Sequence, residues 1–224
     1  MNSGLRIRTE GFFKSYDQMP VLAADPNINL ANLGDDYGFV GAERLLSEGE
    51  GHAYGAELFL QQKLTGSLYF LGAYTLSWSE YAGADNVLKP SAWDRRHSLD
   101  LTAGYRIGEA WEIGSKLRIL SGLAYTPWDL EASGLTYPLT GRGVRDWSRA
   151  GEERSPAYAR LDLRVEREWF FNGWDAIVYI DFQNVLNRAN SLGVAYTQDP
   201  AYPDGLRPLE SVSFLPTFGF SVEF

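Results

Sequence analysis

The last stretch of the chain, residues 211–224, alternates between apolar and small, mostly polar side chains. The apolar set occupies the even positions, and it consists of Val212, Phe214, Pro216, Phe218, Phe220, Val222 and Phe224. Because successive side chains of a strand point to opposite faces, this segment predicts one aromatic face and one polar face. A long strand with so many exposed aromatic rings would aggregate in water, whereas hydrocarbon solvates it. The pattern therefore predicts a strand built to contact lipid.

Composition narrows the class of protein further. The chain has 224 residues and is 45% hydrophobic, yet no run approaches the about 20 apolar residues that a spanning helix needs. A net charge of −9 argues against binding to nucleic acid, whose phosphates require a basic surface. The absence of cysteine excludes disulfides and thiolate chemistry.

Short and long connections alternate along the chain. The short ones contain glycine and lie at residues 64–67, 107–110 and 171–174. The long ones are rich in Gly, Pro, Asp and Asn and lie near residues 20–49, 83–91, 127–156 and 188–210. Short periplasmic turns alternating with long extracellular loops are typical of an up-and-down barrel in the outer membrane.

About eight long strands are expected between these connections. Their predicted ranges are 5–17, 50–64, 67–81, 93–107, 110–125, 157–171, 173–187 and 211–224. The alternation is clearest in the sixth, where Leu161 and Leu163 are interleaved with Arg160, Asp162 and Arg164. We interpret the fold as all-β, an antiparallel up-and-down transmembrane β-barrel segment. Its mixed-charge face lines the lumen, where opposite charges pair across strands, unless it is the solvated face of a soluble sheet.

Four local motifs follow one another in a characteristic order. They are Gly55–Leu58 opening a strand, Asp94–His97 preceding a strand, Asp181–Asn187 closing the penultimate strand, and Leu215–Phe218 leading to the terminal Phe224. In this order and with these connections, the chain resembles the C-terminal barrel of a TonB-dependent outer-membrane receptor over nearly its whole length.

The resemblance implies a barrel of about 22 strands with an N-terminal plug domain, energised through TonB. Residues 1–224 resemble the last third of such a receptor and contain no plug. The expected partners are outer-membrane lipid, the remaining barrel strands and plug, TonB through the parent receptor, and the barrel-assembly machinery. Phe218, Phe220 and Phe224 are the residues that resemble the signal read by that machinery. The expected location is the bacterial outer membrane, and the expected function is uptake of a siderophore, a cobalamin or an oligosaccharide.

Covalent chemistry is not expected. The two histidines, His52 and His97, are far apart and match no metal-binding spacing. No glycine-rich phosphate loop precedes a helix. The sequence therefore predicts no enzyme activity, no metal and no cofactor.

Ligand contacts are expected on the long loops, because recognition concentrates on loops held by a rigid scaffold. The loop at 127–156 mixes aromatic rings, which stack on flat ligands, with guanidinium groups, which bind carboxylate or phosphate. Its ligand-binding candidates are Trp128, Tyr137, Arg142, Arg145, Trp147 and Arg149. The alternative is an exposed loop whose aromatic side chains pack on one another.

Two other functions remain open from the sequence. The first is a self-contained eight-stranded outer-membrane barrel with an anchoring or adhesion role, whose interior is filled by long side chains such as Arg106 and Glu166. The second is a soluble carbohydrate-binding β-protein.

Overall fold

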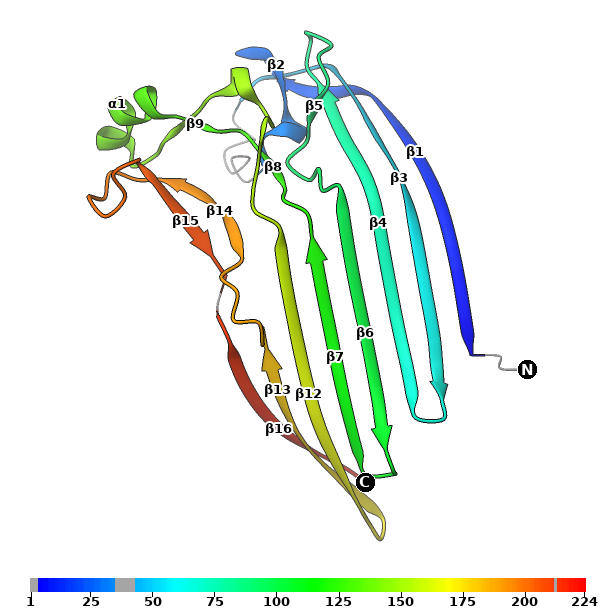
Figure 1. Cartoon of the computed structure of the whole chain (residues 1–224). Coiled ribbons are helices and arrows are strands. Elements are labelled where there is room, and N and C mark those ends of the chain that lie inside the picture. Colours follow the sequence, from blue (N-terminus) through cyan, green and yellow to red (C-terminus); the bar gives the residue numbers. More distant parts are fainter. Residues whose placement is uncertain (1–3, 35–42, 212) are drawn as a thin grey trace.

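Eight long strands form one antiparallel sheet in the computed structural model, which describes residues 4–34, 43–211 and 213–224 (Figure 1). They are β1 (Leu5–Leu22), β3 (Leu45–Thr65), β4 (Leu68–Ala82), β6 (His97–Ile107), β7 (Trp111–Leu120), β12 (Tyr158–Phe171), β13 (Trp174–Gln183) and β16 (Leu215–Glu223). Each pairs with its neighbours in chain order, in the order β16-β13-β12-β7-β6-β4-β3-β1. The all-β, up-and-down antiparallel fold is thus confirmed, as are the tight turns at 65–68, 107–111 and 171–174.

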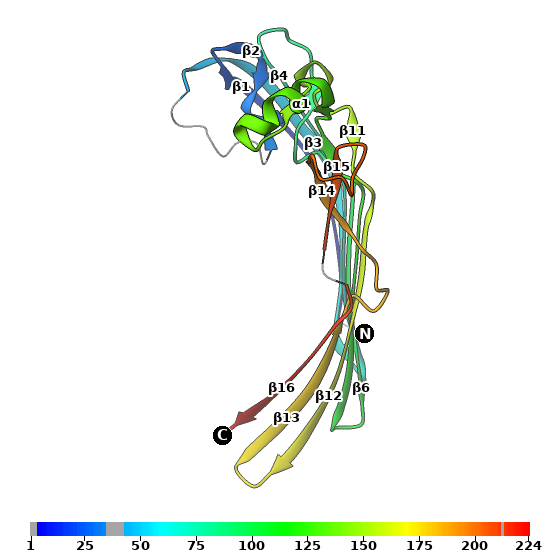
Figure 2. The same ribbon diagram turned by 90° about the vertical axis from the view of Figure 1, so that its left-hand side faces the viewer.

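The other elements gather at the end of the sheet opposite these turns, which we call the loop end. They are β2 (Asp25–Asn29), η1 (Leu30–Asn32), β5 (Lys89–Pro90), β8 (Ala124–Tyr125), β9 (Trp128–Asp129), α1 (Leu130–Thr140), β10 (Val144–Arg145), η3 (Trp147–Arg149), β11 (Glu153–Arg154), β14 (Ser191–Tyr196) and β15 (Leu206–Glu210). Figure 2 shows the sheet edge-on as a single curved layer with this cap at one end. No described helix is long and apolar enough to cross a membrane.

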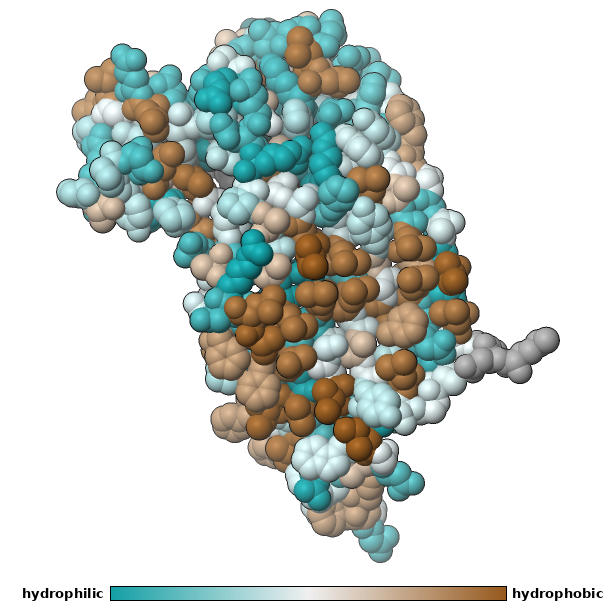
Figure 3. Space-filling model, in the orientation of Figure 1, coloured by the Kyte–Doolittle hydropathy of each residue, from teal (hydrophilic) through white to brown (hydrophobic). Residues whose placement is uncertain are grey.

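The strand register collects the apolar side chains on one face of the sheet. Ile180 of β13 lies directly between Phe218 and Val165 of the flanking strands, and the row continues through Ile113 to Tyr105. Val165 is half-buried and the other four side chains are exposed, Phe218 by 87%. Figure 3 shows apolar side chains gathered over the long strands below a hydrophilic loop end. The whole sheet thus repeats the pattern seen in residues 211–224.

The opposite face is polar and carries ion pairs between strands. Arg118 of β7 lies directly across from Asp100 of β6, with 2.6 Å between Nε and Oδ1. Arg164 of β12 likewise faces Asp181 of β13, at 3.4 Å. The expected pairing of opposite charges across strands on the polar face is therefore confirmed.

The buried apolar cluster lies at the loop end and not beneath the sheet. Ile28, Leu30 and Leu33 form it, and Leu22 and Trp147 pack against them. Asn29 caps η1 by accepting a hydrogen bond from the Ala31 N–H. This small cluster fixes the first long connection over the sheet, while most side chains of the long strands are exposed or half-buried.

Both edges of the sheet are open in the part of the chain that the structure describes. β16 pairs only with β13, and β1 pairs with β3 along its length and with β2 near its end. Pro20 lies on this edge strand, where a missing N–H is tolerated. The described strands therefore do not close into the eight-stranded barrel considered above.

Some sequence expectations on boundaries are wrong. The motif Gly55–Leu58 lies in the middle of β3 and does not open a strand, because β3 begins at Leu45. The connection at 127–156 contains the α1 helix, which Asp129 caps through the Ala132 N–H. The motif Asp181–Asn187 does close its strand, since β13 ends at Gln183 and Asn184 takes a positive φ of 52°.

Tyrosine rings cover glycines of neighbouring strands at directly paired positions. Tyr69 lies across Gly104, and a Cβ added there would come within 2.1 Å of the ring. The Tyr69 hydroxyl donates to the Glu112 Oε1 at 2.6 Å, so the ring is held in place. The same arrangement recurs for Tyr179 on Gly219 and for Tyr81 on Gly51, and in each case glycine is required by the space.

Gly104→Ala is expected to destabilise the folded protein by about 1–3 kcal/mol, because the added methyl forces Tyr69 off its position. Urea unfolding of the protein folded in lipid vesicles measures this. Gly114→Ala is the matched control, since Gly114 is paired directly with Gly104 and its added Cβ would meet only the Arg164 Cβ at 3.7 Å. Equal losses for the two variants would refute the role of the tyrosine–glycine pair.

Candidate ligand-binding site

A cavity of about 470 Å³ opens at the loop end, within the size range of small-molecule sites. Its floor is formed by the last residues of β7 and the first of β12, including Arg118, Leu120 and Tyr158. Leu120 and Tyr158 are directly paired and share the register parity of Arg118, so the cavity lies on the polar face. Its walls come from the connections at 32–34, 92–95, 123–126 and 191–194.

A buried carboxylate holds these connections together. The Asp94 side chain is 0% exposed and pairs with Arg154 of β11 and with the Nε of Arg96 at 3.2 Å. Its Oδ2 accepts the Ser79 N–H of β4 at 2.9 Å. Arg154 also donates to the Gly122 carbonyl at 3.2 Å. Asp94 thus joins its own segment to β4 and β11, and Arg154 extends this link to Gly122 after the end of β7.

The rest of the motif Asp94–His97 continues this framework. Arg95 donates to the Ser121 carbonyl at 2.7 Å, and the His97 N–H donates to the Ser121 hydroxyl at 2.9 Å. Arg96 lies over the Trp78 ring, with Cζ 5.3 Å from the centroid. The motif Asp94–His97 therefore has a structural role at the loop end.

Three of the residues predicted for ligand binding come together with Tyr196. Trp128 and Tyr137 contact the Tyr196 ring at centroid distances of 6.4 and 5.3 Å, and the Trp128 Nε1 donates to the Val194 carbonyl at 3.0 Å. Arg145 stacks on Trp128, with Cζ 3.5 Å from the ring centroid, and lines the cavity. The aromatic rings pack on one another and support Arg145, as the alternative interpretation expected.

The other three predicted residues lie elsewhere. Trp147 packs against the buried cluster of Ile28, Leu30 and Leu33. Arg149 is held by the carboxylates of Glu152 and Glu153, at 2.9 and 3.0 Å. Arg142 is exposed just after the end of α1. None of these three lines the cavity described above.

Sequence reasoning missed most of the lining. The missed side chains with chemical potential are Trp93, Arg95, Arg118, Tyr125 and Tyr158. A partial signal existed, since Arg95 belongs to the motif Asp94–His97 and Arg118 alternates with apolar residues in its strand. Only the fold brings the end of β7 under the connection at 92–95.

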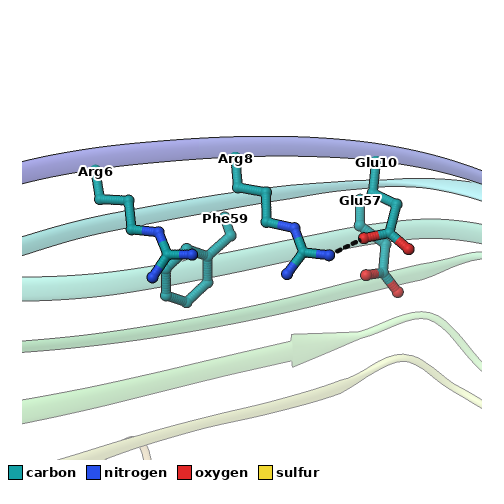
Figure 4. Close-up of a pocket in the computed structure, with 5 residues that line it drawn as sticks. All are labelled: Arg6, Arg8, Glu10, Glu57 and Phe59. Atoms are coloured by element: carbon teal, nitrogen blue, oxygen red, sulfur yellow. Dashed lines mark hydrogen bonds and ion pairs between the residues drawn. The ribbon is translucent and has the colours of Figure 1, made fainter.

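Two shallower hollows lie further along the polar face. One, of about 280 Å³, is lined by Arg6, Arg8, Glu10, Glu57 and Phe59, and Figure 4 shows Arg8 reaching Glu10 there. The other, of about 350 Å³, lies over β6, β7, β12 and β13. The described residues contain no group of three potential ligands arranged to hold a metal ion.

The predicted assembly residues lie along and after the last strand. Phe218 and Phe220 are on the apolar face, the latter 76% exposed, and Phe224 follows the end of β16. Their recognition by an assembly machinery stays a prediction.

The comparisons with known proteins give a likeness in structure. No protein-family model and no curated protein matches the sequence. A solved structure, the closed form of the ferric-catecholate import receptor Fiu from E. coli K12, superposes with a TM-score of 0.61 at 10% sequence identity. The likeness covers 99% of this chain and 25% of that one, so this chain spans about a quarter of the receptor's length. At this identity the likeness establishes a shared fold, that of part of an import-receptor chain.

Proposed function

We propose that residues 1–224 form the C-terminal portion of the β-barrel of a TonB-dependent receptor. This receptor imports a scarce nutrient of the siderophore, cobalamin or oligosaccharide class across the bacterial outer membrane. The observation that carries the proposal is a single-layered, open sheet of eight long strands with one apolar and one charged face. Its superposition on a quarter of an import receptor supports the same conclusion.

The two faces agree with this environment. The apolar face suits lipid, and the charged face suits a wet or plugged lumen. Open edges are not tolerated in hydrocarbon, so β1 and β16 need partner strands, which a larger barrel provides. A small anchoring barrel is less well supported because the described strands form an open sheet. A soluble carbohydrate-binding protein would need its apolar face covered.

In this proposal the protein performs no covalent chemistry. The loop end faces the outside and holds the ligand, the short turns face the periplasm, and TonB acts through the parent receptor. Phe218, Phe220 and Phe224 are read by the barrel-assembly machinery. Import of ferric catecholates by the similar receptor keeps siderophores among the three nutrient classes.

Uptake by cells that produce the full-length protein tests this function. Radiolabelled ferric siderophores, cobalamin and oligosaccharides are offered to these cells and to a deletion strain. We expect one class to accumulate, and we expect accumulation to stop when a protonophore collapses the proton gradient or when TonB is deleted. Accumulation that is indifferent to both treatments would refute the proposal.

A further inference from the structure

The open edge of the sheet along β1 carries charges that the sheet itself does not match. β2 covers this edge only at Val21 and Leu22, so residues 5–20 have no strand on that side within the part of the chain that the structure describes. We propose that this edge binds an antiparallel strand, preceding β1 in the parent receptor chain, that places a carboxylate opposite Arg6 and a basic side chain opposite Glu10. The inference rests on the proposed function, because a larger barrel supplies such a strand.

The inner strands show how this sheet pairs arginines on its polar face. Three of them face an acid at the directly paired position of a neighbouring strand. They are Arg106 with Glu112, Arg118 with Asp100 and Arg164 with Asp181. Opposite charges at such positions stabilise a sheet, and like charges destabilise it. An arginine on the polar face of β1 is therefore expected to have an acid on one of its two neighbouring strands.

Arg6 has no acid opposite it on β3. Its directly paired residue there is Gln61, and Arg8 faces Phe59. Arg8 pairs with Glu10 of its own strand, whereas Arg6 is exposed and forms no ion pair with the described residues. Figure 4 shows these three β1 side chains on the same side of the strand. A carboxylate for Arg6 must then come from across the open edge, where a directly opposite Cβ lies about 5 Å away.

Glu10 requires the opposite charge on the same partner strand. It is directly paired with Glu57 of β3, and on its other side Glu57 faces the neutral Thr75 of β4. Arg8 pairs with Glu10 and leaves Glu57 without an ion pair among the described residues. Two carboxylates that face each other destabilise the sheet. A lysine or arginine opposite Glu10 would offset this repulsion.

Strand register converts the two charges into a sequence pattern. Because the partner runs antiparallel to β1, its residue opposite Glu10 comes four positions before its residue opposite Arg6. The partner residues opposite Ile7 and Thr9 lie on the apolar face, since side chains alternate along a strand. The position opposite Arg8 is left open, because Arg8 already has Glu10. The partner strand is therefore expected to contain a basic residue, then an apolar one, an unspecified one, another apolar one and an acid.

A second copy of this chain fits the edge less well. The other open edge is β16, which ends at Glu223 and contains no basic residue to face Glu10. Its nine residues cannot cover residues 5–20. Backbone N–H and C=O groups left without partners are costly in hydrocarbon. The observations thus favour a longer strand that carries both charges.

Cross-linking in the full-length protein, purified in detergent, tests this. Arg6→Lys keeps the positive charge and adds a reactive amine. A water-soluble carbodiimide activates a carboxylate, the amine attacks it, and an amide forms while the carbodiimide leaves as its urea. Peptide mass spectrometry then identifies the linked residue. We expect an acid on a strand that precedes β1 in the same chain, with Lys or Arg four positions before it.

The unaltered protein is the matched control, because the protonated guanidinium of Arg6 does not condense and no link is expected there. Lys116 is directly paired with Asp162 and provides an internal positive control. A link to Glu223 of a second copy, seen as a dimer on a denaturing gel, would overturn the inference. So would a link to any other acid, or no link at position 6 while Lys116 reacts. The expected link without TonB-dependent uptake would count against the transport function alone, and uptake without the link against this inference alone.

Discussion

Asp94→Asn is expected to lower the free energy of unfolding by about 3 kcal/mol, among the largest effects of any single substitution in this chain. The Asp94 side chain is fully buried and neutralises both Arg154 and Arg96. Asparagine preserves the volume and still accepts the Ser79 N–H, but it removes the carboxylate that pairs with the partly buried Arg154 and leaves Arg96 paired with Glu80 alone. Urea unfolding of the protein folded in lipid vesicles, followed by tryptophan fluorescence, measures the loss.

The effect should also be local to the loop end. Arg154 and Arg96 hold β11 and the start of β6 against β4 through Asp94, so these segments loosen first. Trypsin is then expected to cleave after Arg95 or Arg154 faster than in the unaltered protein. Asp85→Asn is the matched control, because its ion pair with Lys89 is more exposed and is worth less than about 1 kcal/mol. If the two variants lose the same free energy of unfolding and are cleaved by trypsin at the same rate, Asp94 does not organise the loop end.

Much of the sheet was predictable from the sequence because the side-chain period of a strand is two. Leu161, Leu163 and Val165 fix which face of β12 is apolar, and a shift of one residue would reverse it. Tight turns such as that at Gly173, with a φ of 88°, then fix the register of the next strand. Side-chain alternation and turn residues thus determine most of the up-and-down arrangement of the strands.

The loop end could not be predicted in the same way. The strands predicted at 110–125 and 173–187 are too long, because β7 ends at Leu120 and β13 at Gln183. The reason lies in distant partners: the Asn190 side chain bonds the Ala159 backbone, and Asp94 reaches β11. Contacts between residues so far apart in sequence override local propensity and end the strands early.

The candidate site, too, could be predicted only in part from the sequence. Arg145 was predicted from its loop, and it does line the cavity. Arg149 has the same local composition but is neutralised by Glu152 and Glu153. Arg95 and Arg118 belong to different segments, and only the pairing of β6 with β7 brings them to one cavity. Which charged side chains share a cavity therefore depends on strand pairing and not on local composition.

Ile180→Arg is expected to destabilise the protein in lipid vesicles by about 2–4 kcal/mol. Ile180 lies in the middle of β13 on the apolar face, between Val165 and Phe218, and its side chain is exposed. If that face touches acyl chains, a guanidinium there must be desolvated or must bend toward water. Urea unfolding in vesicles measures the cost, and Ile180→Val separates it from a simple change of volume.

Thr217→Arg is the decisive comparison, because Thr217 lies one residue from Phe218 on the same strand but on the opposite face. It is paired directly with Asp181, so the new guanidinium would meet a carboxylate and should cost less than about 1 kcal/mol. A large loss at Ile180 with a small one at Thr217 means that lipid solvates the apolar rows. Equal losses, or a larger loss at Thr217, would mean that the polar face is the buried one, and both the barrel and the transport proposal would fail with it.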